Sequence, residues 1–232
     1  SFAYPDQKMT LTDSCYLIRH GEDYLLWDAG LPAAMLNAPV DANAPLSPTL
    51  ERDLVSQLSE IGVEPSQIGR IGISHYHFDH TGQAATFANA TLLIGAEDLA
   101  ALQQDTPPAF ADPRTLAPWL AGDGETTAVS GDLDIFGDGS VMMLAMPGHT
   151  PGETALLVNL AQTGPVLLSG DVVHFHEQVE NDGVPPFNFD RSESLASMDR
   201  MADIAANLNA TVIIQHDQRD IEKLPIFPNS AN

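Results

Sequence analysis

The sequence predicts an α/β fold of short apolar strands that alternate with amphipathic helices. Apolar runs of strand length recur along the chain, and several are separated by segments whose apolar residues are spaced for one helix face. Polar side chains follow directly where several of these strands end. With 232 residues, 44% of them hydrophobic, the chain can bury a sizeable core, and we expect a single domain over residues 1–232.

The first half is expected to open with a hairpin of strands at 9–18 and 24–28. Ser47 and Pro48 predict the start of a helix, because serine is a favoured N-cap and proline a favoured first helical residue. The apolar run 68–73 predicts a buried strand. Further elements are expected at 83–88 (helix), 91–94 (strand), 97–103 (helix), 141–145, 153–160 and 165–168 (strands), 190–208 (helix) and 210–214 (strand).

The formal net charge is −23, from 32 acidic and 9 basic residues. Nucleic acids and anionic membranes both need basic patches, so this balance argues against either as a partner. No apolar run approaches the length of a membrane span. The one cysteine, Cys15, excludes a disulfide within the chain and a cysteine-rich metal site, and we expect it to be a small buried apolar residue.

A dense group of potential metal ligands follows the predicted strand 68–73: His75, His77, Asp79 and His80. In an extended segment residues i and i+2 share a face, so His75 and His77 can bind one ion. As the chain turns, Asp79 and His80 can face a second ion. Later strand ends lead to His149, Asp171 and His216. Imidazole and carboxylate at this density suit zinc or a similar divalent metal.

These motifs resemble those of the metallo-β-lactamase-fold hydrolases, over about residues 9–226. The resemblance rests on the histidine-rich motif at 75–80, the turn at 147–152, the strand end at 169–171 and the late His216, which occur in the expected order. It implies an αβ/βα sandwich of two mixed sheets flanked by helices. The strand and helix order is compatible with that fold but would not establish it.

The resemblance also implies the ligand set. One metal would be bound by His75, His77 and His149, the other by Asp79, His80 and His216, and Asp171 would bridge both. Zinc is expected, with cobalt, manganese or iron as alternatives. A hydroxide that bridges the ions would attack a carbonyl, Asp79 would carry a proton to the leaving group, and Asp28 would orient a ligand histidine.

Similarities that are less specific than the metal-ligand motifs favour the N-acyl homoserine lactonase branch, whose members open the lactone ring of bacterial signalling molecules. They lie at 15–18, 27–31, 183–188 and 215–217. His174 stands where many members have a tyrosine that assists at the substrate carbonyl or leaving oxygen, so His174 is a candidate catalytic residue. An acyl chain needs an apolar groove, and the candidate groove residues are Met35, Leu36, Phe110, Trp119 and Phe187. For each of them, packing in the hydrophobic core is at least as good an interpretation.

Other activities stay open within the same family. A β-lactamase is disfavoured by the bridging Asp171, and a glutathione thioesterase by the scarcity of basic residues. A promiscuous esterase or phosphotriesterase uses the same ions. An inert metal-binding module would require loss of a ligand, and all seven positions are filled. The resemblance implies a homodimer; the compartment is unknown, with a bacterial periplasmic or secreted location slightly favoured over a cytoplasmic one.

Overall fold

The computed structural model describes residues 8–232, and its strands form two five-stranded mixed sheets, each in a compact unit of its own. The N-terminal unit comprises residues 13–94 and 99–128. The C-terminal unit comprises, among the described residues, 8–12, 95–98 and 129–232. The predicted α/β class with two mixed sheets is confirmed, whereas the single domain over residues 1–232 stays a prediction.

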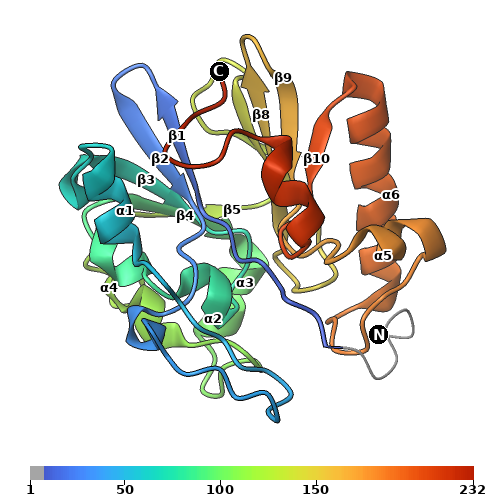
Figure 1. Cartoon of the computed structure of the whole chain (residues 1–232), viewed down its shortest axis with the longest axis horizontal. Helices are drawn as coiled ribbons and strands as arrows, with labels where there is room; N and C mark the ends of the chain where they lie inside the picture. Colours follow the sequence, from blue (N-terminus) through green and yellow to red (C-terminus); the bar gives the residue numbers. More distant parts are fainter. Residues whose placement is uncertain (1–7) are drawn as a thin grey trace. The chain divides into compact units, whose positions relative to one another are not determined.

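The sheet of the N-terminal unit has the strand order β1-β2-β3-β4-β5 (Figure 1). Its strands are β1 (Tyr16–His20), β2 (Asp23–Trp27), β3 (Ile68–Gly72), β4 (Thr91–Gly95) and β5 (Thr126–Val129). β1 and β2 form a hairpin as predicted, but its first strand begins at Tyr16 and not at residue 9. The tight turn places Gly21 at φ +61°, a conformation that glycine adopts readily. β2, β3 and β4 then run parallel, so the carboxyl ends of β2 and β3 meet at one edge.

Short helices accompany this sheet. The α-helices are α1 (Leu54–Glu60), α2 (Phe78–Thr81), α3 (Ala96–Leu102) and α4 (Ala117–Leu120), and the 3-10 helices are η1 (Ala33–Met35), η2 (Pro65–Gln67), η3 (Ala84–Phe87) and η4 (Pro113–Leu116). The prediction that a helix begins at Ser47 is wrong. Asp53 is the N-cap of α1 and accepts a hydrogen bond from the Ser56 amide. That bond stabilises the ionised carboxylate and lowers the pKa of Asp53 below its ordinary value.

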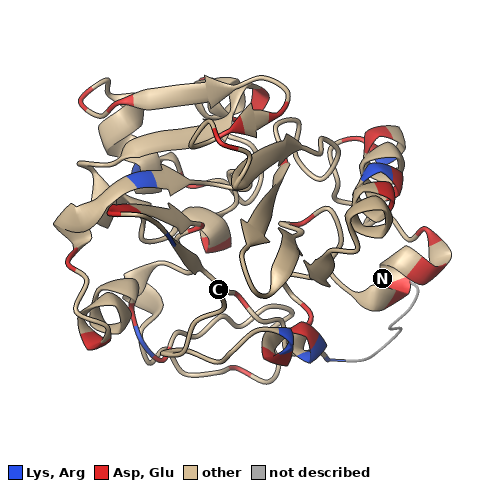
Figure 2. Cartoon of the chain, turned by 90° about the horizontal axis from the view of Figure 1, so that it is seen from above, with Lys and Arg blue, Asp and Glu red and all other residues tan. Residues whose placement is uncertain are grey.

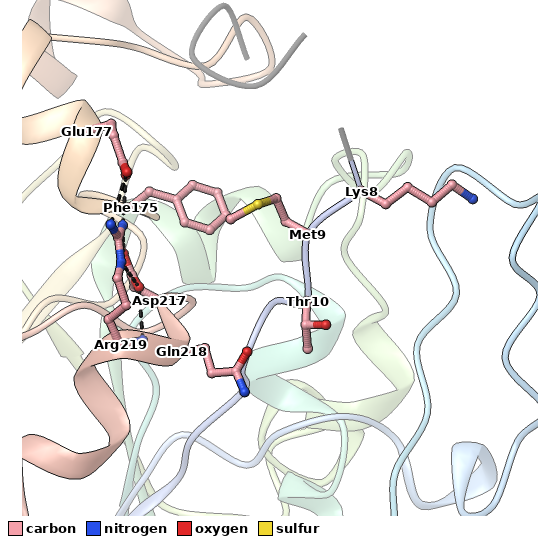
Figure 3. A pocket seen from close by; sticks show the side chains of 8 residues that line it. All are labelled: Lys8, Met9, Thr10, Phe175, Glu177, Asp217, Gln218 and Arg219. Carbon is pink, nitrogen blue, oxygen red and sulfur yellow. Dashed lines mark hydrogen bonds and ion pairs between the residues drawn. The ribbon is translucent and has the colours of Figure 1, made fainter. Parts of the chain in front are cut away.

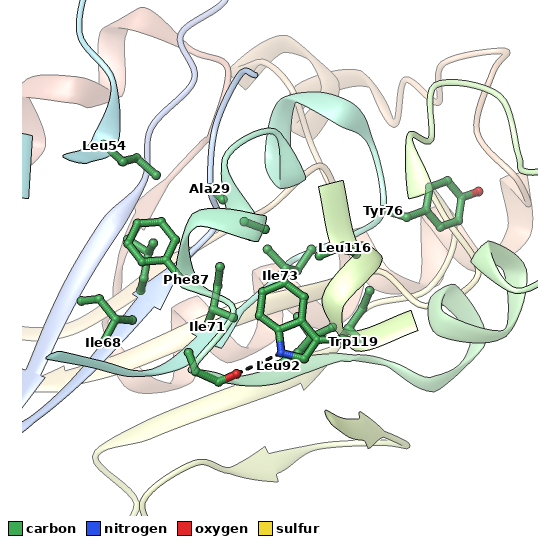
Figure 4. Packing of buried hydrophobic residues seen from close by; sticks show 14 of the residues in the cluster. Ala29, Leu54, Ile68, Ile71, Ile73, Tyr76, Phe87, Leu92, Leu116 and Trp119 are labelled. Atoms are coloured by element: carbon green, nitrogen blue, oxygen red, sulfur yellow. Dashed lines mark hydrogen bonds between the residues drawn. The ribbon is translucent and has the colours of Figure 1, made fainter. Parts of the chain in front are cut away.

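The apolar core of the N-terminal unit packs helices against the sheet (Figure 4). Ile71 and Leu92 are fully buried on adjacent strands, and Phe87 from η3 packs with them. Trp119 joins this core with 4% of its surface exposed, and its indole Nε1–H donates to the Ala90 carbonyl at 2.9 Å. Of the two interpretations of Trp119, the structure therefore selects the core residue, not the groove.

The sheet of the C-terminal unit has the order β10-β9-β8-β7-β6. Its strands are β6 (Leu133–Asp134), β7 (Val141–Ala145), β8 (Thr154–Leu160), β9 (Gly164–Leu168) and β10 (Thr211–Ile213), and its helices are α5 (His176–Asn181), α6 (Arg191–Leu208) and the 3-10 helix η5 (Gln218–Lys223). Asp190 is the N-cap of α6, and its side chain accepts hydrogen bonds from the amides of Ser192 and Glu193. Met198 and Met201 of α6 pack on Leu144 and Leu167 of the sheet, beside which α6 lies in Figure 1.

Acidic side chains are spread over both units and far outnumber basic ones (Figure 2). They occur on loops and on the outer side of α6, where Glu193 and Asp199 are exposed. None of the helices formed by residues 8–232 is long and apolar enough to cross a membrane.

Candidate metal centre

The first group of candidate ligands lies where β2 and β3 end. Trp27 pairs with Gly72 across the parallel strands, so Asp28, directly after β2, and Ser74, two residues beyond β3, come together. Asp28 accepts hydrogen bonds from the Ser74 amide at 2.7 Å and from the Ser74 hydroxyl at 3.0 Å. Both residues are fully buried, and Asp28 has φ +59°, an uncommon conformation that aspartate tolerates better than most residues. Asp28 and Ser74 therefore form a buried support beneath the histidines that follow β3.

Asp28 and Ser74 orient two of the histidines. Asp28 Oδ2 lies 2.9 Å from Nδ1 of His80, and a carboxylate can only accept, so His80 donates from Nδ1 and keeps its lone pair on Nε2. The Ser74 hydroxyl gives its proton to Asp28, so it accepts from Nδ1 of His75, 3.1 Å away. Nε2 of His75 then faces Nδ1 of His77 at 2.9 Å. The ring nitrogens of His75 and His77 converge, as two ligands of one ion would.

Helix α2 carries Asp79 and His80. His77 is its N-cap residue, and Asp79 lies in its first turn, with Oδ2 4.0 Å from Nε2 of His80. Gly82 follows the helix and packs so closely that a Cβ there would lie 2.2 Å from the Pro32 nitrogen. A glycine is therefore required at this point, which holds α2 against the loop after β2.

The second group of ligands comes from three strand ends of the C-terminal unit. His149 follows β7, Asp171 follows β9 and His216 follows β10. Ser169 ties two of these ends together, since its amide donates to the Ile213 carbonyl at 3.0 Å and its hydroxyl accepts from the Gln215 amide at 3.2 Å. The parallel β9–β10 pair thus places Asp171 beside His216.

His149 and His216 both direct Nε2 toward Asp171. His149 donates from Nδ1 to the Asn188 side-chain oxygen at 3.1 Å, and His216 donates from Nδ1 to the Thr12 carbonyl at 2.7 Å. In the neutral imidazole each Nε2 therefore carries a lone pair, and these atoms lie 3.3 Å (His149) and 3.0 Å (His216) from Asp171 oxygens. Lone pairs that face a carboxylate repel each other unless a cation lies among them. The donor set therefore fits a divalent metal.

His174 lies in the same cluster but is held differently. Its Nε2 is 3.2 Å from Asp171, and its ring stacks on that of His216 with centroids 5.6 Å apart. Its Nδ1 is buried and has no hydrogen-bond partner among residues 8–232, whereas the Asp171 carboxylate, which can only accept, favours a proton on Nε2. The ring of Phe187, 55% exposed, meets the rings of His149 and His174 edge to face. His174 therefore lies in the cluster around Asp171, and its ring contacts the exposed ring of Phe187.

The main chain after His216 is braced by ion pairs (Figure 3). Arg219 bonds Glu177 at 2.8 Å and also bonds Asp217. Burial alone would raise the pKa of Asp217, but hydrogen bonds from Arg219 and from the His176 amide outweigh it and hold that pKa at about 2. A surface pocket of about 310 Å³ lies here, lined by none of the seven predicted ligands.

Several supporting residues could not be found from sequence spacing. Asn188 lies 39 residues from His149, Thr12 acts through its backbone carbonyl, and Glu153 binds the Asp171 amide. Phe110 also stands out, because its half-exposed ring meets that of His77 and it has φ +62°. Asp28, which the family resemblance implied would orient a ligand histidine, does bond His80.

Comparison with known proteins identifies the family. The model of the family described as "Metallo-beta-lactamase superfamily" matches residues 11–216. The chain belongs to the metallo-β-lactamase superfamily. An N-acyl homoserine lactonase of a Bacillus species is 28% identical over 231 residues, covering 97% of this chain and 88% of the relative. The lactonase AttM of Agrobacterium fabrum is 29% identical over 190 residues, covering 78% and 72%.

A similar solved structure is an N-acyl homoserine lactone hydrolase with the product N-hexanoyl-L-homoserine bound at its catalytic metal center. It has a TM-score of 0.82 and 25% identity, and the match covers 97% of this chain and 89% of that one. The predicted metallo-β-lactamase fold is confirmed, and the protein is a metal-dependent hydrolase. Membership of this family and the histidine and aspartate clusters indicate two divalent ions.

Proposed function

We propose that this superfamily member hydrolyses N-acyl homoserine lactones and thereby inactivates bacterial signals. The similarity to named lactonases over 97% of the chain supports the substrate class. The observation that carries the metal chemistry is the orientation of His149 and His216, whose Nε2 lone pairs both face Asp171. A lactone also matches the scarcity of basic residues, because it brings no charge that would need a cationic partner.

The proposed ligands form two sets, with Asp171 shared between them. His75, His77 and His149 would hold one ion, and Asp79, His80 and His216 the other. When bound, the ions polarise the lactone carbonyl and lower the pKa of a water molecule. Zinc is the proposed metal, because imidazole and carboxylate ligands suit it and no cysteine lies among them. A homodimer and a periplasmic or secreted location remain part of the proposal.

Two residues are proposed to act on protons. Asp79 has a side chain that is 26% exposed, unlike the buried His80 beside it, so it can exchange a proton with a leaving alkoxide. His174 is proposed to donate a hydrogen bond to the carbonyl or leaving oxygen, in the place of the tyrosine of other lactonases. Because Asp171 can only accept and lies 3.2 Å from Nε2, that nitrogen is the one proposed to carry the proton that His174 donates.

Replacement of His174 by alanine should lower kcat for lactone opening by about 100-fold, which is typical for loss of one hydrogen-bond donor at a reacting oxygen. Both metals should remain bound, because His174 is not among the ligands. Steady-state kinetics with metal analysis of the same samples tests this. His176→Ala is the matched control, since His176 binds Asp220 at 2.6 Å and not Asp171. Wild-type kinetics in His174→Ala would remove His174 from the reaction.

A substrate panel tests the proposed activity itself. Proton release from N-acyl homoserine lactones would be followed in a pH-stat, beside nitrocefin, paraoxon and a glutathione thioester, with a chelated sample as control. We expect metal-dependent turnover of the lactones well above that of the other three substrates. Turnover of one of those three alone would be consistent with a metal-dependent hydrolase but would replace the proposed lactone with a β-lactam, a phosphotriester or a thioester as the substrate.

A further inference from the structure

Glu153 is a buried carboxylate directly beside the Asp171 main chain. It follows the turn that carries His149 and precedes β8, and only 1% of its surface is exposed. Its Oε1 accepts a hydrogen bond from the backbone N–H of Asp171 at 2.9 Å. An ionised carboxylate is costly to bury, so its retention at this place calls for a specific role.

The main chain of Glu153 holds the other ligand segment. Its carbonyl accepts from the Met146 amide at 2.8 Å, which closes the turn around His149. Asp98 secures the same turn, accepting from the Thr150 hydroxyl at 2.9 Å and from the Gly152 amide at 2.6 Å. One residue, Glu153, thus connects the segment of His149 with the segment of Asp171.

We propose that Glu153 is a positioning residue that fixes the Asp171 main chain so that its carboxylate faces His149 and His216. This inference rests on the proposed role of Asp171 as a metal ligand. Free rotation of the Asp171 peptide would turn its oxygens away from the two Nε2 atoms. Mutation of a supporting partner of this kind typically lowers metal affinity or activity about 10- to 100-fold.

Three substitutions separate the hydrogen bond from the charge. Glu153→Gln keeps an acceptor oxygen at the same reach and removes the charge. Glu153→Asp keeps the charge but is one methylene shorter, so it cannot reach the Asp171 amide. Glu153→Met keeps the volume and removes both. Val158→Ala, a truncation further along β8 and away from the ligands, controls for general loosening of the buried strand.

The readout is the affinity of the metal-free protein for Zn²⁺, measured by competition with a chromophoric chelator. We expect Glu153→Asp and Glu153→Met to lose about 10- to 100-fold in affinity, and Glu153→Gln and Val158→Ala to stay within about threefold of wild type. The visible spectrum of the Co²⁺-loaded protein should change in the first two variants only. If Glu153→Met does not fold, the aspartate variant decides.

Unchanged affinity in Glu153→Asp would overturn the inference. A loss in Glu153→Gln as large as that in Glu153→Asp would also overturn it, because the acceptor oxygen that glutamine keeps would then not be sufficient to hold the Asp171 amide. Asp171→Asn, measured in parallel, keeps this result separate from the ligand assignment. Wild-type affinity in Asp171→Asn would refute Asp171 as a ligand and the Glu153 inference with it. Loss in Asp171→Asn with none in Glu153→Asp would refute the role of Glu153 alone.

Discussion

Asp171→Ala should abolish metal-dependent lactone hydrolysis, leaving no more turnover than the chelated wild-type protein has. The carboxylate is the partner of His149, His174 and His216, and we propose that it contacts both ions. Removal of a shared ligand should cost more than the roughly 100-fold that loss of a supporting partner costs. Initial rates at saturating Zn²⁺ and metal content by mass spectrometry measure the effect.

The control for Asp171→Ala is Asp199→Ala, which removes an exposed carboxylate from α6 in the same unit. That variant should keep full activity and both metals. Activity of Asp171→Ala within tenfold of wild type would exclude a bridging role and would leave the ions to be held by histidines and Asp79.

Asp28→Ala should have the second largest effect, on stability and metal binding together. Without the carboxylate, the buried Ser74 amide loses its acceptor, at a cost of about 1–3 kcal/mol. Alanine at φ +59° adds about 1–2 kcal/mol of strain. Nδ1 of His80 also loses its partner, so metal affinity should fall about 10- to 100-fold. Urea unfolding of the metal-free protein and chelator competition measure the two effects separately.

Asp28→Asn is the matched variant, because asparagine tolerates the same backbone conformation and keeps one acceptor oxygen. It should recover most of the stability but only part of the metal affinity, since one carboxylate oxygen is replaced by an NH₂ group. Metal affinity of wild-type strength in Asp28→Ala would contradict the proposal that Asp28 orients His80.

The site was more predictable than the helices that surround it. The candidate ligands His75 and His77 lie close together in sequence and directly after an apolar strand, so their spacing alone indicates a candidate metal site. Helix starts depend on tertiary contacts. Ser47 was predicted as an N-cap, but its hydroxyl accepts a hydrogen bond from the Asp41 amide. The Leu50 amide donates to the Met35 carbonyl. These contacts hold the stretch in a loop that ends at Asp53.

Hydrogen-bond partners that lie far apart in the chain could not be predicted either, because they too depend on tertiary contacts. The carbonyl of Thr12 lies 204 residues from His216, and a backbone group leaves no sign in the sequence. Glu153 and Asn188 carry common polar side chains, and only the fold reveals that they face Asp171 and His149. Trp119 lies in a proline-rich stretch without periodicity, so sequence alone could not separate a core residue from a groove residue.

The most direct test of the central claim is a titration of the metal-free protein with Zn²⁺ while the opening of an N-acyl homoserine lactone is recorded. The proposed binuclear site predicts almost no turnover without metal, a rise as zinc is added, and a plateau at two equivalents per chain. Full turnover in the metal-free protein, or none with two equivalents bound, would contradict it.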